Sequence, residues 1–155
     1  MPKEKSAGAI IYRKEDNIIY YLLLHYPAIN RKGGHWEFAK GHIEEGESEE
    51  KTVKREIAEE TGIKDIEIIP GFKKYLKYFF RQTYGLEGEA RKKAPWIFKL
   101  VAFYVAETST KEVKISPEHI GFAWLPFDEA FKKITYKNSK ELLKEVNEFI
   151  QGKGL

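Results

Sequence analysis

The segment from residue 41 to residue 63, GHIEEGESEEKTVKREIAEETGI, constrains the fold more than any other part of the chain. It contains eight carboxylates and three basic side chains in 23 positions. Ser48 is placed to cap the first turn of a helix, and Gly62 is placed to end the last turn. The segment therefore predicts an amphipathic helix, although like charges four residues apart destabilise a helix.

Three acids of this predicted helix converge on one stripe. At about 100° per residue, Glu56, Glu59 and Glu60 lie within an arc of roughly 100°. The neighbouring arc carries Val53 and Ile57, which face a core. Grouped carboxylates repel one another unless a cation neutralises them, and oxygen ligands without His or Cys favour Mg²⁺ or Mn²⁺. The stripe predicts a metal site completed by phosphate oxygens or, alternatively, an acidic face balanced by solvent.

The charge of the remaining residues is opposite in sign. The chain has a formal net charge of +3 and the acidic segment carries −5, so the other 132 residues carry +8. An acidic site in a basic background suits a divalent cation together with a polyanionic substrate. The absence of cysteine excludes disulfides and thiolate metal sites. Because residues 1–14 lack a long apolar stretch and the longest apolar run spans only residues 18–24, we expect a cytoplasmic protein without a membrane segment.

The order of apolar runs predicts an α/β fold. Residues 27–41 are predicted to be a loop rich in glycine, and residues 81–95 a polar loop or hairpin tip. Helices are predicted around the acidic segment, over residues 128–134 and over residues 139–150, the last behind a Ser139 cap. Strands are predicted within residues 6–13, 17–26, 65–72, 73–80 and 96–108. Residues 113–127 are predicted to form a short strand, a loop that contains Pro117, and a second strand that ends at Pro126. This order indicates a single domain over residues 1–155, with helices on both faces of a mixed sheet.

The full spacing of the acidic segment carries a resemblance. Gly41 is followed by Glu47 after five residues, and Arg55-Glu56-Ile57 follows after seven more. Glu59-Glu60 and Gly62-Ile63 complete nine specified positions. This pattern resembles the signature of the Nudix hydrolases. The resemblance implies the Nudix fold, an α/β/α sandwich around a mixed sheet, and Mg²⁺-dependent hydrolysis of a nucleoside diphosphate linked to another group, with Mn²⁺ able to replace Mg²⁺.

The same resemblance implies roles for individual residues. Arg55 and Glu47 are expected to keep the carboxylates in place, and one of the acids is expected to act on the attacking water. The expected metal ligands are Glu56, Glu59 and Glu60, with the carbonyl of Gly41 as an additional ligand. Among the signature positions, Arg55, Glu56, Glu59 and Glu60 are therefore the predicted catalytic residues.

The flanking segments resemble one Nudix subfamily, the diadenosine tetraphosphate hydrolases. These segments are HWEFAKGHIEEGE, GFKKYLKYFFR, AFYVAET and ISPEHIGFAWL. The resemblance implies phosphate contacts by His35 and Lys40, a cleft bordered by Tyr78 and Arg81, and Glu118 as a further metal ligand or base. Stacking on aromatic rings is the usual means of binding adenine, and Tyr78 and Phe103 are the predicted ring contacts. The alternatives are a surface cation at Lys40 and Arg81, a structural or solvent-exposed histidine at His35, a loop carboxylate at Glu118 and core packing for the aromatic residues.

Two features depart from the subfamily pattern. Ala39 stands where the subfamily usually has proline, which loosens the loop without removing a functional group. The polar stretch over residues 82–95 is longer than expected and contains the basic run Arg91, Lys92 and Lys93. This stretch affects the expected substrate more than the expected chemistry.

The predicted function is asymmetric hydrolysis of diadenosine tetraphosphate to ATP and AMP. One alternative is removal of pyrophosphate from an RNA 5′ end, in which residues 91–93 help to bind RNA. Another nucleoside diphosphate derivative as substrate is a second alternative. A third, from a different class, is a nucleotide-binding module without activity, which is expected to lack the ligand carboxylates present here. The expected assembly is a monomer or a small homo-oligomer.

Overall fold

The N-terminal apolar runs form a hairpin in the computed structural model, which describes residues 3–28, 33–81, 83 and 85–155. Strand β1 (Lys3–Glu15) pairs antiparallel with β2 (Ile18–Tyr26). Asp16 and Asn17 connect them with φ values of 53° and 66°. Two consecutive positive φ angles are what a tight hairpin turn requires, so these two residues set the register of the hairpin.

The sheet is mixed because β7 (Trp96–Glu107) runs parallel to β1. The other pairings are antiparallel: β4 with β1, β3 and β8 with β2, and β5 and β6 with β7. The bounds of these strands are β3 (His35–Glu37), β4 (Ala39–His42), β5 (Glu67–Ile68), β6 (Lys74–Arg81) and β8 (Gly121–Pro126). The long β1–β7 pair is therefore the centre to which the shorter strands attach.

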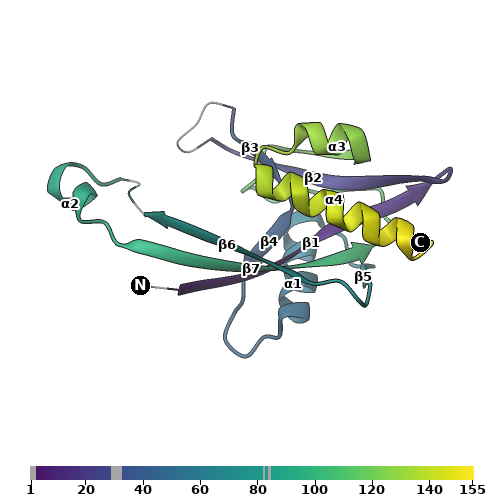
Figure 1. The fold of residues 1–155 in the computed structure, drawn as a ribbon, viewed down its shortest axis with the longest axis horizontal. Coiled ribbons are helices and arrows are strands. Elements are labelled where there is room, and N and C mark those ends of the chain that lie inside the picture. Colours follow the sequence, from purple (N-terminus) through teal and green to yellow (C-terminus); the bar gives the residue numbers. More distant parts are fainter. Residues whose placement is uncertain (1–2, 29–32, 82, 84) are drawn as a thin grey trace.

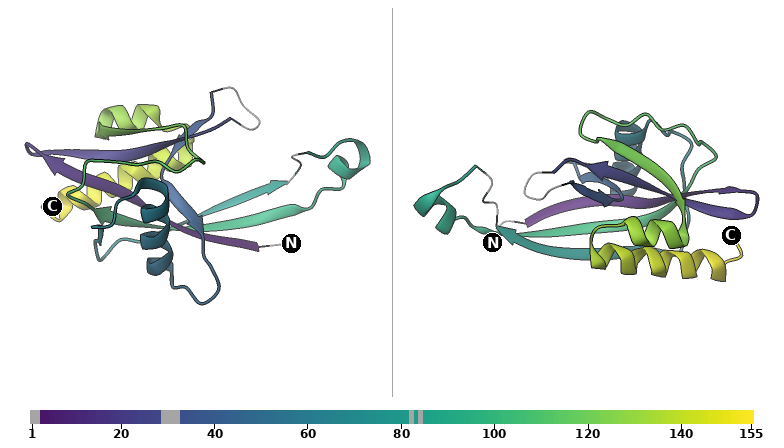
Figure 2. Two further views of the ribbon diagram at one scale, coloured as in Figure 1. Left: turned by 180° about the vertical axis from the view of Figure 1, so that it is seen from behind. Right: turned by 90° about the horizontal axis from the view of Figure 1, so that it is seen from above.

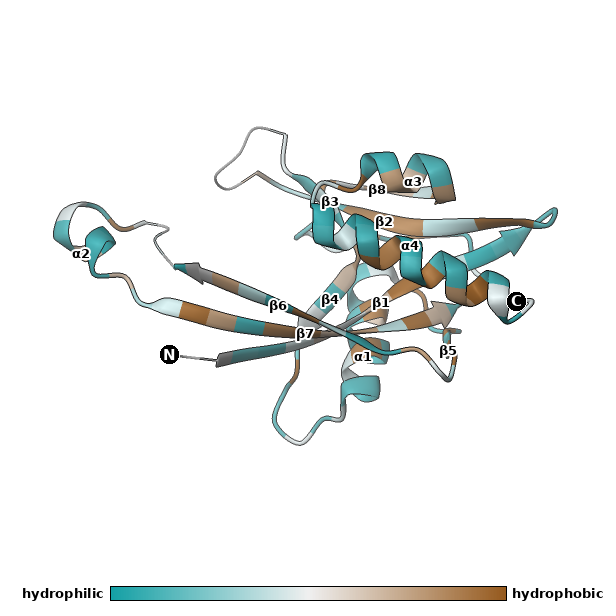
Figure 3. Ribbon diagram, viewed as in Figure 1, coloured by the Kyte–Doolittle hydropathy of each residue, from teal (hydrophilic) through white to brown (hydrophobic). Residues whose placement is uncertain are grey.

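Helices cover both faces of the sheet (Figure 2). Helix α1 (Glu49–Thr61) packs on one face, where Val53 and Ile57 join a core cluster with Ala9 and Ala102. Helices α3 (Phe127–Lys133) and α4 (Lys137–Gly152) cover the other face. Hydrophobic and hydrophilic bands alternate along α4, as expected for a helix with one buried face (Figure 3). The predicted α/β/α arrangement around a mixed sheet is confirmed.

Three local predictions were wrong. Strand β3 and all of β4 except its last residue lie inside the predicted loop 27–41. The segment between β6 and β7 is a hairpin tip, one of the two alternatives predicted for it, and it contains the short helix α2 (Gly88–Lys92). Residues 113–116 form no strand. Ser139 does not cap α4, which begins two residues earlier; its buried hydroxyl donates to the Glu37 carboxylate at 2.7 Å. Strands of three or four residues and a buried serine depend on distant partners, so local sequence signals do not identify them.

Strands β6 and β7 continue beyond the body of the molecule and carry α2 at their far end (Figure 1). The pairing runs without interruption from Lys74↔Phe103 to Arg81↔Trp96. Among the described residues, no helix is both long and apolar enough to cross a membrane.

Candidate active site

Helix α1 begins and ends where the sequence predicted. The Ser48 side chain accepts a hydrogen bond from the first turn at 3.2 Å, and Gly62 adopts a left-handed φ of 75° just after the last turn. Val53 and Ile57 are fully buried against the sheet. Because this face is fixed by packing, the acidic stripe beside it is fixed as well.

Strand β4 brings Gly41 against this helix. Gly41 pairs with Ala7 of β1. A Cβ atom at residue 41 would lie 2.0 Å from the carboxyl carbon of Glu56. A side chain there would displace the Glu56 carboxylate, so glycine allows the β4 backbone and this carboxylate to approach each other.

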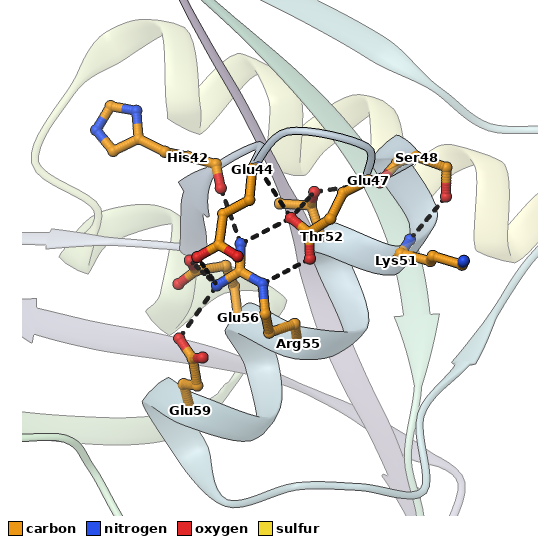
Figure 4. A network of polar contacts seen from close by, with 9 residues as sticks. All are labelled: His42, Glu44, Glu47, Ser48, Lys51, Thr52, Arg55, Glu56 and Glu59. Carbon is orange, nitrogen blue, oxygen red and sulfur yellow. Dashed lines mark hydrogen bonds and ion pairs between the residues drawn. The ribbon is translucent and has the colours of Figure 1, made fainter.

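Arg55 contacts four of the eight acids of the segment, Glu44, Glu47, Glu56 and Glu59 (Figure 4). Its Nε and Nη2 atoms donate to the two oxygens of Glu47 at 2.7 and 2.9 Å. Its Nη1 atom donates to Glu56 at 2.8 Å and to Glu59 at 3.2 Å, while Nη2 also donates to the carbonyl of His42 at 2.9 Å. A two-pronged Arg–carboxylate pair of this kind fixes orientation as well as distance. Arg55 and Glu47 thus anchor the loop before α1 to the acidic stripe.

This network shifts the pKa values of two carboxyl groups in opposite directions. The hydrogen bonds from Arg55 lower the pKa of Glu47 from 4.5 to about 2. Burial raises the pKa of Glu56, the Arg55 hydrogen bond opposes that rise, and repulsion from Glu60 and Glu59 adds to it. The negative charge at Glu56 is therefore only partly compensated by Arg55, and a further cation at this position would stabilise it.

Glu47→Gln is expected to lower the stability of the folded protein at neutral pH and to have little effect on it in strong acid. Because the folded-state pKa of Glu47 is lowered to about 2, the stabilisation is complete above about pH 4.5 and is lost as the pH falls towards 2. Melting temperatures measured across this range should show a gap between variant and wild type that closes at the acid end. The control is Glu45→Gln, an exposed carboxylate of the same loop. A gap independent of pH would contradict this account of Glu47.

Glu60 is buried, with 4% of its surface exposed, and both of its oxygens have neighbours. The Lys40 backbone N–H donates to Oε1 at 3.2 Å, and the Tyr26 hydroxyl donates to Oε2 at 3.4 Å. The Nε2 atom of His119 lies 3.0 Å from Oε2, and its Nδ1 atom lies 2.9 Å from the Ser116 hydroxyl. These contacts come from β2, β4 and the loop before β8, so three separate parts of the fold orient this carboxylate.

A cleft of about 710 Å³ opens beside the acidic stripe. Two lysines, Lys40 of β4 and Lys99 of β7, line it together with Arg55 and the acids of α1. Burial lowers the pKa of Lys99, and the positive charge of Lys40 lowers it further. An anion between these two ammonium groups would relieve their repulsion. The cleft thus combines a group of carboxylates suited to a cation with a pair of lysines suited to an anion.

The structure brings most of the predicted site residues to this cleft. The lining includes Lys40, Gly41, Arg55, Glu56, Glu59, Glu60 and Glu118. Glu118 reaches it from the loop between β7 and β8, far along the chain from α1. Residues of β4, of α1 and of the loop before β8 are therefore gathered at one place by the fold.

The prediction that Phe103 contacts adenine was wrong. Its side chain is fully buried and packs edge-on against Phe38, with 6.0 Å between ring centroids. Arg81 does not lie at the cleft either. Its guanidinium donates to the backbone carbonyls of residues 91, 92 and 94 and so closes the hairpin that carries α2. Phe103 faces the core because strand alternation places it on the side of β7 covered by α4.

Tyr78 and His35 lie one side chain away from the lining of the cleft. The Lys40 ammonium nitrogen is 5.8 Å from the centre of the half-buried Tyr78 ring. The His35 ring stacks on Tyr26, with centroids 4.9 Å apart and planes within 3°. Both residues therefore support lining residues in this structure rather than forming the surface of the cleft.

Sequence reasoning missed Tyr26, Lys99 and His119, all of which contribute to the site. Lys99 interrupts an otherwise apolar strand run, and His119 directly follows Glu118, so both had a local signal. Tyr26 had none, because a tyrosine at the end of a strand run is usually a packing residue. Its connection to Glu60 depends on the pairing of β2 with the rest of the sheet.

The residues at the cleft fit a hard divalent cation. Throughout the described part of the chain, no three His, Cys, Asp or Glu side chains form a ready-made metal cluster. Arg55 lies between Glu56 and Glu59 instead. All the candidate donors are nevertheless carboxylate or carbonyl oxygens. The charges of Glu59 and Glu60 repel that of Glu56, and the Gly41 backbone lies directly against the Glu56 carboxylate. Such oxygen donors are what Mg²⁺ prefers in proteins.

Known proteins resemble the chain over nearly its whole length. The chain is 34% identical over 157 residues to the asymmetrical bis(5′-nucleosyl)-tetraphosphatase of Sus scrofa, and the alignment covers 94% of the chain and 95% of that protein. It is 30% identical over 121 residues to the RNA pyrophosphohydrolase of Sulfurovum sp. (strain NBC37-1), which covers 75% of the chain and 74% of that protein.

A solved structure gives the same result for the fold. A Caenorhabditis elegans Ap4A hydrolase in a binary complex superposes with a TM-score of 0.76 at 28% identity, covering 96% of this chain and 98% of that one. The family described as NUDIX domain matches residues 2–146. Because the family matches most of the chain and the structure has the acidic helix beside a cleft, the chain belongs to the Nudix hydrolase family.

Proposed function

We propose that this Nudix hydrolase cleaves diadenosine tetraphosphate asymmetrically to ATP and AMP with the help of Mg²⁺. The observation that carries the proposal is the cleft, in which the acids of α1 face two lysines, Lys40 and Lys99. A long polyphosphate needs cations along its chain as well as a metal at the bond that breaks. The similarity to an asymmetrical tetraphosphatase over 94% of the chain supports this choice of substrate.

The acids of α1 are proposed to bind the metal. Glu56, Glu59 and Glu60 would supply carboxylate oxygens, and Gly41 would add its backbone carbonyl. When bound, the ion lowers the pKa of a coordinated water and neutralises charge on the phosphates, and Mn²⁺ would serve as well as Mg²⁺. Arg55 would release part of its bonding to Glu56 and Glu59 while keeping both bonds to Glu47.

The remaining residues of the cleft are proposed to position the substrate. Lys40 and Lys99 would bind phosphate oxygens, and Glu118 would act as a base towards water or as a further ligand. His35 and Tyr78 stay as candidate contacts at the margin of the cleft, each packed against a lining residue. Binding of charge and orientation of water account for most of the rate enhancement in phosphoryl chemistry of this kind.

His119→Ala is expected to reduce the turnover number about ten- to a hundredfold and to raise the Mg²⁺ concentration needed for half-maximal rate. The reason is that Glu60 loses a neighbour at 3.0 Å that fixes its orientation. The measurement is a Mg²⁺ titration at saturating dinucleotide. The matched control is His25→Ala, because His25 stacks on Trp36 and does not line the cleft. If the Mg²⁺ requirement of His119→Ala equals that of wild type, the orienting role is wrong.

Removal of pyrophosphate from an RNA 5′ end is the second candidate. It is supported by the similarity to an RNA pyrophosphohydrolase and by the basic run at residues 91–93. The experiment compares turnover of diadenosine tetraphosphate and of a short triphosphorylated RNA at equal Mg²⁺. We expect faster turnover of the dinucleotide, with ATP and AMP in equal amounts. ADP as the sole product would reject asymmetric cleavage, and a strong preference for RNA would reverse the order of the two candidates.

A further inference from the structure

The hairpin that projects from the body has a higher net positive charge than the protein as a whole. We call residues 77–100 the arm; it comprises most of β6, helix α2 and the start of β7 (Figure 1). The arm contains six Lys and Arg residues and two Glu residues, a net charge of +4. Since the formal charge of the chain is +3, all other residues together carry −1. The positive field of the molecule is therefore concentrated on this projection.

One face of the arm alternates aromatic and basic side chains. Residues paired across β6 and β7 share a face, and every second pair lies on the same side. On this side Phe79 pairs with Phe98, with ring centroids 5.0 Å apart, and the Arg81 guanidinium lies 5.8 Å from the Trp96 ring centre. We call these the platform residues: Lys77, Phe79, Arg81, Trp96, Phe98 and Leu100.

The first strand adds another cation to this platform. Lys77 pairs with Leu100 of β7, and Leu100 pairs in turn with Lys5 of β1. Both lysines are exposed. The row Lys77–Leu100–Lys5 across the three strands therefore has a lysine at each end, and it lies next to the Phe79–Phe98 pair.

The platform is open to solvent. Phe79 is 61% exposed and Trp96 is 54% exposed, among the most exposed of the large hydrophobic side chains in the described residues. Nearer the body, the same face reaches α1, where the Tyr75 hydroxyl donates to Glu49 at 2.9 Å. The opposite face of the arm includes Ile97, which is only 5% exposed. Aromatic side chains gathered on one exposed face indicate a binding surface rather than scattered surface residues.

Charge decides between two kinds of occupant. A second copy of this chain would bring its own arm, also at +4, against the first, and the two fields would repel. A single-stranded nucleic acid has an anionic backbone for the lysines and flat bases for the aromatic rings. Exposed rings separated by cations are what such a ligand requires, because stacking tolerates any base and the cations follow the phosphates.

We propose that the platform of the arm binds single-stranded nucleic acid, and RNA is the ligand used to test this. This binding is separate from hydrolysis in the cleft, since Phe79 and Trp96 do not line the cleft. The two are nevertheless neighbours along the chain, because Lys99 of the cleft stands between Phe98 and Leu100 of the platform. By strand alternation the Lys99 side chain lies on the opposite face of β7 from the platform, so the two sites are on different sides of the arm.

The test is fluorescence anisotropy with the full chain and a labelled single-stranded RNA of about 16 nucleotides at about 50 mM salt. The RNA carries a 5′ hydroxyl, so it offers no pyrophosphate to the cleft. We expect binding that weakens with salt and exceeds the binding of a duplex of the same length. Phe79→Ala combined with Trp96→Ala should weaken binding by at least about tenfold, since each ring stacks on a base. Replacing Lys77 and Lys5 by Gln should make the salt dependence shallower, by about 0.7 in slope for each phosphate that the protein no longer neutralises.

Two matched variants control for exposed residues on the body. Phe122→Ala removes a 41% exposed ring from β8, and Lys144→Gln removes an exposed cation from α4. Neither should change RNA affinity by more than about twofold. Hydrolysis of dinucleotide by the Phe79→Ala, Trp96→Ala protein should stay within about twofold of wild type, which also shows that it is folded.

Three outcomes would overturn the proposal. The first is wild-type protein that fails to bind the RNA at low salt. The second is binding that survives replacement of both platform rings. The third is a dimer in sedimentation experiments that dissociates when Phe79 and Trp96 are replaced, with no RNA binding, which would assign the platform to a second copy. If the wild-type protein did not hydrolyse diadenosine tetraphosphate, the proposed function would be wrong. The proposal for the platform would stand, because RNA with a 5′ hydroxyl is bound and not cleaved.

Discussion

Glu56→Gln should lower the turnover number by about a thousandfold while leaving the fold intact. In our account Glu56 is a metal ligand at the centre of the acidic stripe, in contact with Arg55 and directly against the Gly41 backbone. Removing one preorganised charge at the reacting centre commonly costs two to three orders of magnitude in rate. The measurement is the rate of ATP and AMP formation at saturating dinucleotide and Mg²⁺.

The same variant should be at least as stable as wild type without metal. Burial raises the pKa of Glu56, and neighbouring acids repel its charge, so a neutral amide at this position removes an unfavourable charge. Added Mn²⁺ should raise the melting temperature of wild type and have a smaller effect on the variant. The control is Glu50→Gln, an exposed acid of the same helix that does not line the cleft. Normal turnover by Glu56→Gln would remove the basis of the proposed chemistry.

Gly41→Ala is expected to reduce turnover about a hundredfold or more. The added methyl group would meet the Glu56 carboxyl carbon at 2.0 Å, so either β4 or the carboxylate has to move. A displacement of about 1 Å at a catalytic group can cost a hundredfold in rate. We expect a much smaller effect on the free energy of unfolding, because the atoms that the methyl group meets are the end of a flexible side chain. Steady-state kinetics and urea unfolding measure the two effects.

The control for this substitution is Gly152→Ala near the end of α4, where the added methyl group meets nothing within 4 Å besides its chain neighbours and its own helix backbone. It should change neither turnover nor stability by much. If Gly41→Ala retained full activity, the close approach of β4 to Glu56 would have no part in the mechanism, and the proposed carbonyl ligand would be wrong.

The acidic helix could be predicted in detail because its signals are local. The cap at Ser48, the glycine at position 62 and the spacing of the acids are all contained within one short segment. The pairing of Arg55 with Glu47 also follows from positions eight residues apart. For these features, neighbours in sequence are neighbours in space.

The parts that were missed depend on contacts between distant segments. Strand β4 is four residues long and contains a glycine, so it exists because β1 is there to pair with it. Alternation along a strand shows that half of the aromatic residues face the core, without showing which half. Phe103 was therefore placed at the substrate when it belongs to the core. The contact between His119 and Glu60 joins residues that are 59 positions apart, and only the folded chain reveals it.

The most direct test of the account is a crystal structure with Mn²⁺ and a non-hydrolysable analogue of diadenosine tetraphosphate. We predict an anomalous scattering peak bonded to carboxylate oxygens of Glu56, Glu59 and Glu60, with the phosphate chain running towards Lys40. Bound analogue with no metal peak at these three side chains would contradict the account.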